Sequence, residues 1–138
     1  MNKLILLIPI LLLTSLTCER EPDMIPSGTY TGTFQRQDTF GDGEISNVTI
    51  TFSKYSWTGE SDVHNYPAIG YGSYSLKKDK VTFDNKSQFT ADFDFSLILS
   101  GDFFISINND QVRISRDYSG APNDTWTDIY LLKKENKK

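Results

Sequence analysis

The stretch FDFSLILSGDFFISINNDQVRI, residues 93–114, decides the expected fold. Apolar side chains recur at every second position from Phe93 to Leu99 and again from Phe103 to Ile107, which is the period of a half-buried strand. Residues 100–102 and 108–110 consist of Ser, Gly, Asn and Asp, which favour tight turns. The stretch therefore predicts three consecutive antiparallel strands that fold back on one another.

The same alternation extends over the rest of the chain after residue 27. Further strands are predicted around residues 30–34, 48–52, 55–62, 71–76, 81–83 and 128–132. The composition agrees, because only three alanines occur, while all of the 2 Trp, 7 Tyr and 9 Phe residues follow the first 27. Alanine is the best helix former and aromatic residues favour strands, so almost no helix is expected.

The sequence predicts eight or nine short strands that are joined by short links, without a helical crossover. The unpaired edge strands of such a sheet are prone to aggregation, and closure into a barrel removes these edges. The sequence therefore predicts an all-β fold, an eight-stranded antiparallel up-and-down barrel, with a two-sheet sandwich as the alternative. The alternation also predicts which side chains point inward. These are Phe34, Phe52, Phe93, Phe95, Leu97 and Phe103.

The first 18 residues have the organisation of a secretory signal. Lys3 precedes an apolar run from Leu4 to Leu13, and residues 14–17 then lead to Cys18, the only cysteine. The run is shorter than the roughly 20 apolar residues that a membrane span needs. An unpaired thiol is a liability in an oxidising compartment, so we interpret Cys18 as the site of cleavage and lipidation. The alternative is an ordinary signal peptide followed by an incidental cysteine.

Four segments follow from this interpretation. They are a signal peptide (1–17), a flexible tether from the lipidated cysteine (18–27), the barrel domain (28–134) and a basic tail (135–138). The chain carries a formal net charge of −4 with acids and bases interspersed. Nucleic-acid binding needs a concentrated basic face, so no nucleic-acid partner is expected. The expected contact is with a membrane, through the lipid on Cys18.

A family resemblance rests on three features of the barrel segment. They are the opening Gly28-Thr29-Tyr30-Thr31-Gly32, the Gly-x-aromatic strand starts at Gly72 and Gly101, and the closing run Ile129–Lys134. Together they resemble the small lipocalin-like lipoproteins of Bacteroidota, and the residues before Cys18 resemble the loose lipobox of the same group. The resemblance implies a calycin-type barrel that is lipid-anchored at the bacterial outer membrane, on its periplasmic or cell-surface face.

Motifs that would carry catalysis or bind a metal ion are weak in this sequence. Ser61, Asp62 and His64 lie close together in sequence, but a nucleophile triad needs geometry rather than proximity. With a single histidine, a multi-histidine zinc site is excluded. The acidic turn that begins at Asp38 fails the EF-hand spacing, because its twelfth position is Thr49 rather than Glu. We therefore expect neither an enzyme nor a cofactor.

Aromatic residues near the predicted strand ends are the remaining functional signal. Trp57, Tyr71 and Trp126 are the candidate ligand-binding residues, because aromatic-lined barrel mouths bind ligands. The expected function is a non-catalytic envelope lipoprotein that binds a small apolar ligand in the barrel or presents its loops to a protein partner. The alternative is a surface carbohydrate-binding module that uses exposed tryptophan.

Overall fold

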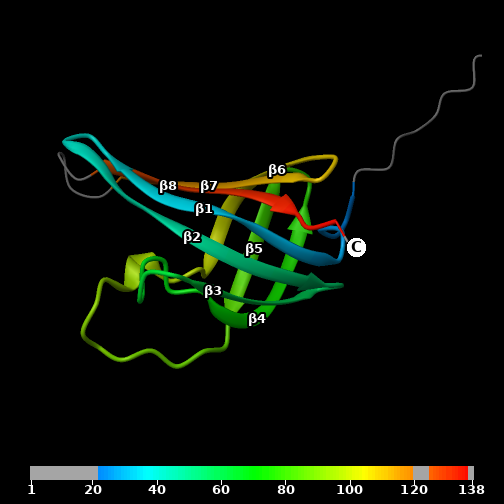
Figure 1. The fold of residues 1–138 in the computed structure, drawn as a ribbon, viewed down its shortest axis with the longest axis horizontal. Coiled ribbons are helices and arrows are strands. Elements are labelled where there is room, and N and C mark those ends of the chain that lie inside the picture. Colours follow the sequence, from blue (N-terminus) through cyan, green and yellow to red (C-terminus); the bar gives the residue numbers. More distant parts are fainter. Residues whose placement is uncertain (1–21, 120–124, 137–138) are drawn as a thin grey trace, which may run out of the picture.

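Eight antiparallel strands close into one barrel in the computed structural model, which describes residues 22–119 and 125–136 (Figure 1). Each strand pairs with its neighbours in sequence, and β1 pairs with β8 to close the sheet. The strands are β1 (Gly28–Asp38), β2 (Gly41–Ser53), β3 (Ser56–Ser61), β4 (Gly70–Lys77), β5 (Lys80–Asn85), β6 (Gly101–Asn108), β7 (Gln111–Ser119) and β8 (Thr125–Lys134). The predicted up-and-down barrel is confirmed.

A glycine allows β1 to lie close to β8 where the barrel closes. Gly32 stands opposite Leu132, between the buried residues Tyr30 and Phe34. A Cβ at this position would lie 1.8 Å from the Leu131 carbonyl oxygen, which no side chain can tolerate. The opening Gly-Thr-Tyr-Thr-Gly pattern therefore has a steric cause, because the first strand needs a residue without a side chain at its contact with the last strand.

The interior of the barrel is filled by its own side chains, largely aromatic. Phe34 and Tyr130 lie with ring centroids 4.8 Å apart, and Phe83 and Phe103 lie 5.7 Å apart in an edge-to-face contact. The predicted inward residues Phe34, Phe52 and Phe103 are each at most 2% exposed. Rings at these separations are in mutual contact, so the interior is a packed core.

The two ends of the barrel differ. At the end that we call the base, two-residue turns join β2 to β3, β4 to β5 and β6 to β7, and each begins with a residue of positive φ: Lys54, Lys78 and Asn109. At the other end, the mouth, the loops 62–69 and 86–100 connect β3 to β4 and β5 to β6. Figure 1 shows the base on the right, beside the C-terminus, and these two loops on the left.

The chain enters the barrel at the base. Of the predicted tether, residues 22–27 are described, and Ile25 among them is fully buried. The Ile25 N–H donates to the Tyr74 hydroxyl (3.0 Å), and the Tyr30 hydroxyl donates to the Pro26 carbonyl (2.8 Å). The packed domain thus begins before residue 28, because Ile25 covers the aromatic core at this end.

The predicted strand at residues 93–99 is wrong. This segment lies in the mouth loop and contains a short 3-10 helix, η1 (Phe95–Leu97). The Asp94 side chain accepts a hydrogen bond from the Ser96 N–H (2.9 Å), which caps the turn in place of strand pairing. Ala68 and Leu97 then form a backbone hydrogen bond (3.1 Å) that ties this loop to the neighbouring loop 62–69.

The predicted inward orientation of Phe93 and Phe95 is wrong for the same reason. Phe95 is 54% exposed and Phe93 is half-buried, and both lie outside the core. Leu97 packs partly against the core, and Leu99 is fully buried. The apolar alternation in this segment therefore reflects two loop leucines that reach the core and two phenylalanines that do not.

Candidate functional site

Three charged side chains converge inside the mouth of the barrel. Arg36 on β1 and Arg116 on β7 both stand opposite Asp128 on β8, and all three point to the inner face. Arg36 holds Asp128 in a bidentate pair, with Nε to Oδ1 at 2.6 Å and Nη2 to Oδ2 at 2.8 Å. Asp128 is only 2% exposed, so this ion pair is largely shielded from water.

The two arginines also bind the mouth loop 86–100. Arg36 Nη1 donates to the Asp94 carboxylate and to the Ser96 hydroxyl, each at 3.0 Å. Arg116 donates to the backbone carbonyls of Ser96 (2.7 Å) and Ser100 (2.9 Å). These contacts join strands β1, β7 and β8 to the loop across the barrel end. We call Arg36, Asp94, Ser96, Arg116 and Asp128 the mouth cluster.

The charges of the mouth cluster balance one another. Burial alone would lower the pKa of Arg36, but its hydrogen bonds and ion pairs with Asp128 and Asp94 outweigh burial and raise it. Burial likewise opposes ionisation of Asp94, and the hydrogen bonds from Ser96 together with the Arg36 charge lower its pKa below the usual value. Two cations thus face two anions, so the cluster holds the loop in place and leaves no excess charge for a ligand.

Aromatic rings extend the mouth cluster in both directions. The Trp126 ring stacks on Tyr118, with centroids 4.1 Å apart and an interplanar angle of 15°. The Arg36 guanidinium lies 4.6 Å from the Trp126 ring centroid, and Arg116 lies 4.3 Å from that of Phe103. Tyr118 and Arg36 belong to the two strands on either side of β8, so both neighbouring strands contact the Trp126 ring.

Three phenylalanines form a second feature of the mouth, on the loop that the arginines hold. Phe89 and Phe93 have ring centroids 5.8 Å apart, and Phe93 and Phe95 are 5.3 Å apart. We call these residues the loop aromatic cluster. Sequence reasoning assigned Phe93 and Phe95 to the core and missed this surface. The available signal was the Asp94-Phe95-Ser96 turn, since Asp and Ser side chains favour local hydrogen bonds over strands.

The three predicted ligand-binding residues lie in different environments. Trp57 is 3% exposed, and its indole N–H donates to the Ser73 carbonyl (3.1 Å). Tyr71 is 56% exposed and stands on the outer face of β4. Trp126 lies at the mouth, in the stack described above. The structure does not bring these three side chains together. The predicted lipidation residue Cys18 lies outside the described residues.

The residues weighed for catalysis are engaged elsewhere. Ser61 donates its hydroxyl to the Tyr66 carbonyl (2.9 Å), and Asp62 accepts from the Asn47 side chain (2.6 Å). His64 is exposed, and its Nε2 lies 3.1 Å from the Asn65 amide. Within the described ranges, no group of three or more His, Cys, Asp or Glu residues is placed to hold a metal ion.

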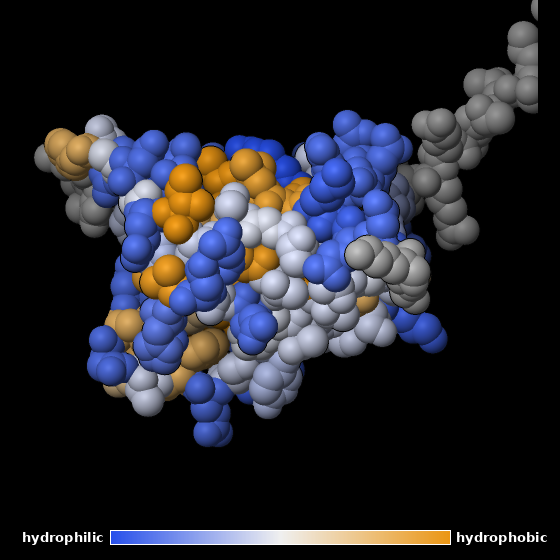
Figure 2. Space-filling model, viewed as in Figure 1, coloured by the Kyte–Doolittle hydropathy of each residue, from blue (hydrophilic) through white to orange (hydrophobic). Residues whose placement is uncertain are grey.

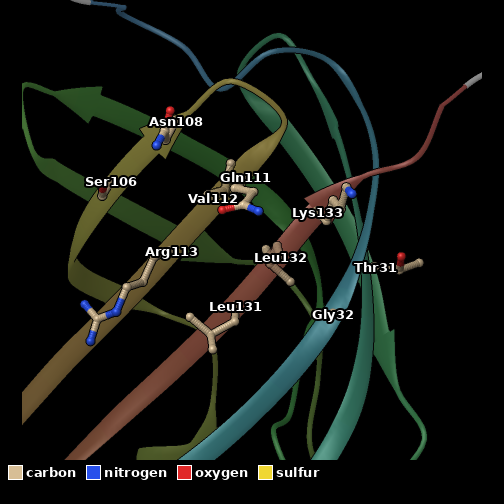
Figure 3. A pocket seen from close by; sticks show the side chains of 10 residues that line it. All are labelled: Thr31, Gly32, Ser106, Asn108, Gln111, Val112, Arg113, Leu131, Leu132 and Lys133. Atoms are coloured by element: carbon tan, nitrogen blue, oxygen red, sulfur yellow. The ribbon is translucent and has the colours of Figure 1, made fainter.

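The outer surface carries an open depression of about 510 Å³ over β1, β6, β7 and β8 (Figure 3). Its lining combines apolar Leu131 with the polar side chains of Gln111, Arg113 and Lys133. Leu131 is 52% exposed on β8. Figure 2 shows a hydrophobic area on the face of the molecule where β1, β7 and β8 lie. Most of its lining residues stand on the outer face of the barrel wall.

Comparison of the chain with protein-family models, curated proteins and solved structures finds no match. In the part of the chain that the structure describes, no helix has the length and hydropathy of a membrane span.

Proposed function

We propose that this protein is a membrane-anchored, non-catalytic envelope lipoprotein whose packed barrel presents its mouth to a protein partner. The observation that carries the proposal is the loop aromatic cluster, Phe89, Phe93 and Phe95, which lies outside the core on a loop fixed by five hydrogen bonds from Arg36 and Arg116. Aromatic side chains on a preorganised surface dominate the binding energy of protein interfaces.

The packed interior favours a protein partner over a small apolar ligand. Lipid-binding barrels hold their ligand in a hollow interior, whereas Tyr30, Phe34, Phe83 and Tyr130 are at most 2% exposed here and fill that space. The carbohydrate alternative needs a flat aromatic face open to solvent. Trp126 is half-buried and already stacked on Tyr118, and Trp57 is buried, so neither tryptophan presents a fully exposed ring.

The exposed aromatic area at the mouth has the composition of an interface centre. Phe95 is 54% exposed, and the adjoining Phe89 and Phe93 are half-buried. Monomeric proteins rarely leave several large apolar side chains together on one surface, and such surfaces often mark sites of interaction. The mouth cluster fixes the loop before binding, which lowers the entropic cost of forming a complex.

The lipid anchor is supported by the sequence and by the entry of the chain at the base. Lys3, the apolar run and Cys18 follow the order of a lipoprotein signal. Ile25 is packed into the base, at the opposite end of the barrel from the mouth cluster. A lipid on Cys18 would hold the base close to the membrane and leave the mouth free to meet a partner, as the resemblance to lipocalin-like lipoproteins also implies.

Affinity capture from solubilised envelope tests this proposal. The immobilised protein should retain a defined partner, and Phe93→Ala/Phe95→Ala should release it. Phe104→Ala is the matched control, because Phe104 is as exposed as Phe95, at 54%, but lies on the outer face of β6. Retention of the same proteins by the loop variant would contradict the role of the mouth.

A ligand titration tests the small-ligand alternative in the same protein. Fatty acids and haem-like compounds should leave the fluorescence of Trp57 unchanged, because Trp57 is 3% exposed within the packed barrel. A saturable change at micromolar concentrations would favour a small-molecule carrier instead.

A further inference from the structure

Charge is distributed unequally between the two ends of the barrel. Among residues 22–119 and 125–136, six lysines lie at the base, where they face four acidic residues: Lys54, Lys77, Lys78, Lys80, Lys133 and Lys134, with Asp23, Asp79, Asp110 and Glu135. In the same described ranges, eleven acidic residues lie on the mouth half, where the cations are Arg36, Lys86 and Arg116: Asp38, Asp42, Glu44, Glu60, Asp62, Asp84, Asp92, Asp94, Asp102, Asp117 and Asp128. The molecule is therefore an electric dipole along the barrel axis.

The lysines of the base are poorly neutralised within the protein. Lys77 and Lys80 stand directly opposite each other in the β4–β5 hairpin, with Lys78 in the turn between them. Like charges in directly opposite positions destabilise a hairpin. Among the described residues of the base, the recorded ion pair is that of Lys133 with Asp110, at 3.8 Å. An anionic surface placed against the turn would reduce this repulsion between the lysines.

The chain enters the base next to this turn. Pro22, the first described residue, lines one small depression together with Lys78 and Asp79. Cys18 precedes Pro22 by four residues, and four residues span at most about 14 Å. An acyl chain on Cys18 would therefore enter the bilayer within about two Debye lengths of Pro22, the residue that shares a depression with Lys78, at physiological ionic strength.

We propose that the lysine-rich base docks on an anionic lipid surface, which orients the barrel with its acidic mouth away from the membrane. The inference rests on the proposed anchoring at Cys18 and adds a second, electrostatic contact. Basic residues close to an anionic bilayer attract it with about 1 kcal/mol each, which corresponds to roughly fivefold in affinity per lysine. The same field repels the acidic half, so the two halves favour one orientation.

Vesicle co-sedimentation of the chain from Glu19 onward tests the docking without any acyl chain. This chain retains all eight strands and Ile25. It should bind vesicles with about one third phosphatidylglycerol at least ~10-fold more tightly than pure phosphatidylcholine vesicles at low salt. Binding should disappear at 1 M salt, where the Debye length falls to about 3 Å.

Charge reversal locates the surface. Lys77→Glu/Lys80→Glu should weaken binding to the anionic vesicles at least ~25-fold, since two fivefold contributions are lost. Lys54→Glu/Lys133→Glu should act in the same direction from two other elements of the base. Lys86→Glu is the matched control, because Lys86 is an exposed lysine of the mouth half, 2.5 Å from Asp84, and it should change binding by less than ~2-fold.

Two results would contradict the proposal that the base docks on anionic lipid. One is equal binding to neutral and anionic vesicles, and the other is a loss of binding in Lys86→Glu as large as that in Lys77→Glu/Lys80→Glu. The protein in this assay lacks the lipid anchor and any partner. Either result would therefore not contradict partner binding at the mouth, which the affinity capture tests separately. Loss of lipid labelling or of partner capture with intact vesicle binding would instead contradict the proposed function.

Discussion

Removal of the Asp128 charge tests how strongly the mouth cluster holds the barrel end. In Asp128→Asn, the buried carboxylate that accepts two hydrogen bonds from Arg36, at 2.6 and 2.8 Å, becomes a neutral amide. Arg36 is 13% exposed and Arg116 is 23% exposed, so both guanidinium groups lose their shielded counter-charge. Breaking a buried ion pair by removing one partner costs about 3–5 kcal/mol. Because both arginines keep some contact with water, we expect about 3 kcal/mol.

Urea and thermal denaturation measure this change. A loss of about 3 kcal/mol is a large share of the typical 5–15 kcal/mol of a small domain, and it corresponds to a fall of roughly 10–15 °C in Tm. Asp117→Asn is the control, because Asp117 is exposed on the same strand as Arg116 and bonds only Thr127 (2.8 Å) in the described structure. It should cost less than about 0.5 kcal/mol. Equal stabilities of the Asp128 and Asp117 variants would refute the argument that the mouth cluster fixes the loop.

Three other predictions follow from the packing, the buried tyrosine and the anchor. Phe34→Ala should lower the free energy of unfolding, measured by urea denaturation, by about 3–5 kcal/mol because Phe34 is 1% exposed. Phe95→Ala changes a half-exposed loop position and should lower it by less than about 1 kcal/mol. A larger loss in Phe95→Ala than in Phe34→Ala would contradict the outward orientation of Phe95. Burial raises the pKa of Tyr130 above its ordinary value of 10.0, so the folded state favours the neutral phenol. The resulting stability is complete below pH 10 and is lost as the pH rises above it. Alkaline unfolding should thus begin above pH 10 and move to higher pH in Tyr130→Phe. An unchanged pH midpoint of unfolding in this variant would contradict the raised pKa of Tyr130. Radiolabelled fatty acid should enter the wild-type protein and not Cys18→Ser, and an unlabelled wild type would end the lipoprotein interpretation.

The barrel could be predicted because its strands alternate without interruption. Val48, Ile50 and Phe52 are all at most 2% exposed on β2, as the alternation required. The polar residues 108–110 also marked a strand end correctly, because Asn109 and Asp110 form the turn between β6 and β7. Gly101 and Asp102 instead belong to the start of β6. Closure followed from counting strands and from the cost of open edges.

The mouth loop could not be predicted by the same rule. Alternation from Phe93 to Leu99 is compatible with a strand, but Leu99 reaches the core and Phe95 is exposed from a loop. The mouth cluster could not be predicted from local sequence patterns either, because Arg36 and Asp128 are 92 residues apart in sequence. Only the closing pairing of β1 with β8 makes them neighbours. Long-range pairing of this kind leaves no local pattern in the chain.

In-cell photo-crosslinking tests the central claim most directly, namely that the mouth of the anchored barrel meets a protein partner. A photoreactive amino acid at position 95 should give one discrete adduct, whereas the same amino acid at position 104 should give none. The native side chains at these positions, Phe95 and Phe104, are equally exposed at 54%. The adduct should persist in the Tyr71→Ala background, because Tyr71 stands on the outer face of β4. Adducts from position 104 alone, or the same adducts from both positions, would contradict the account.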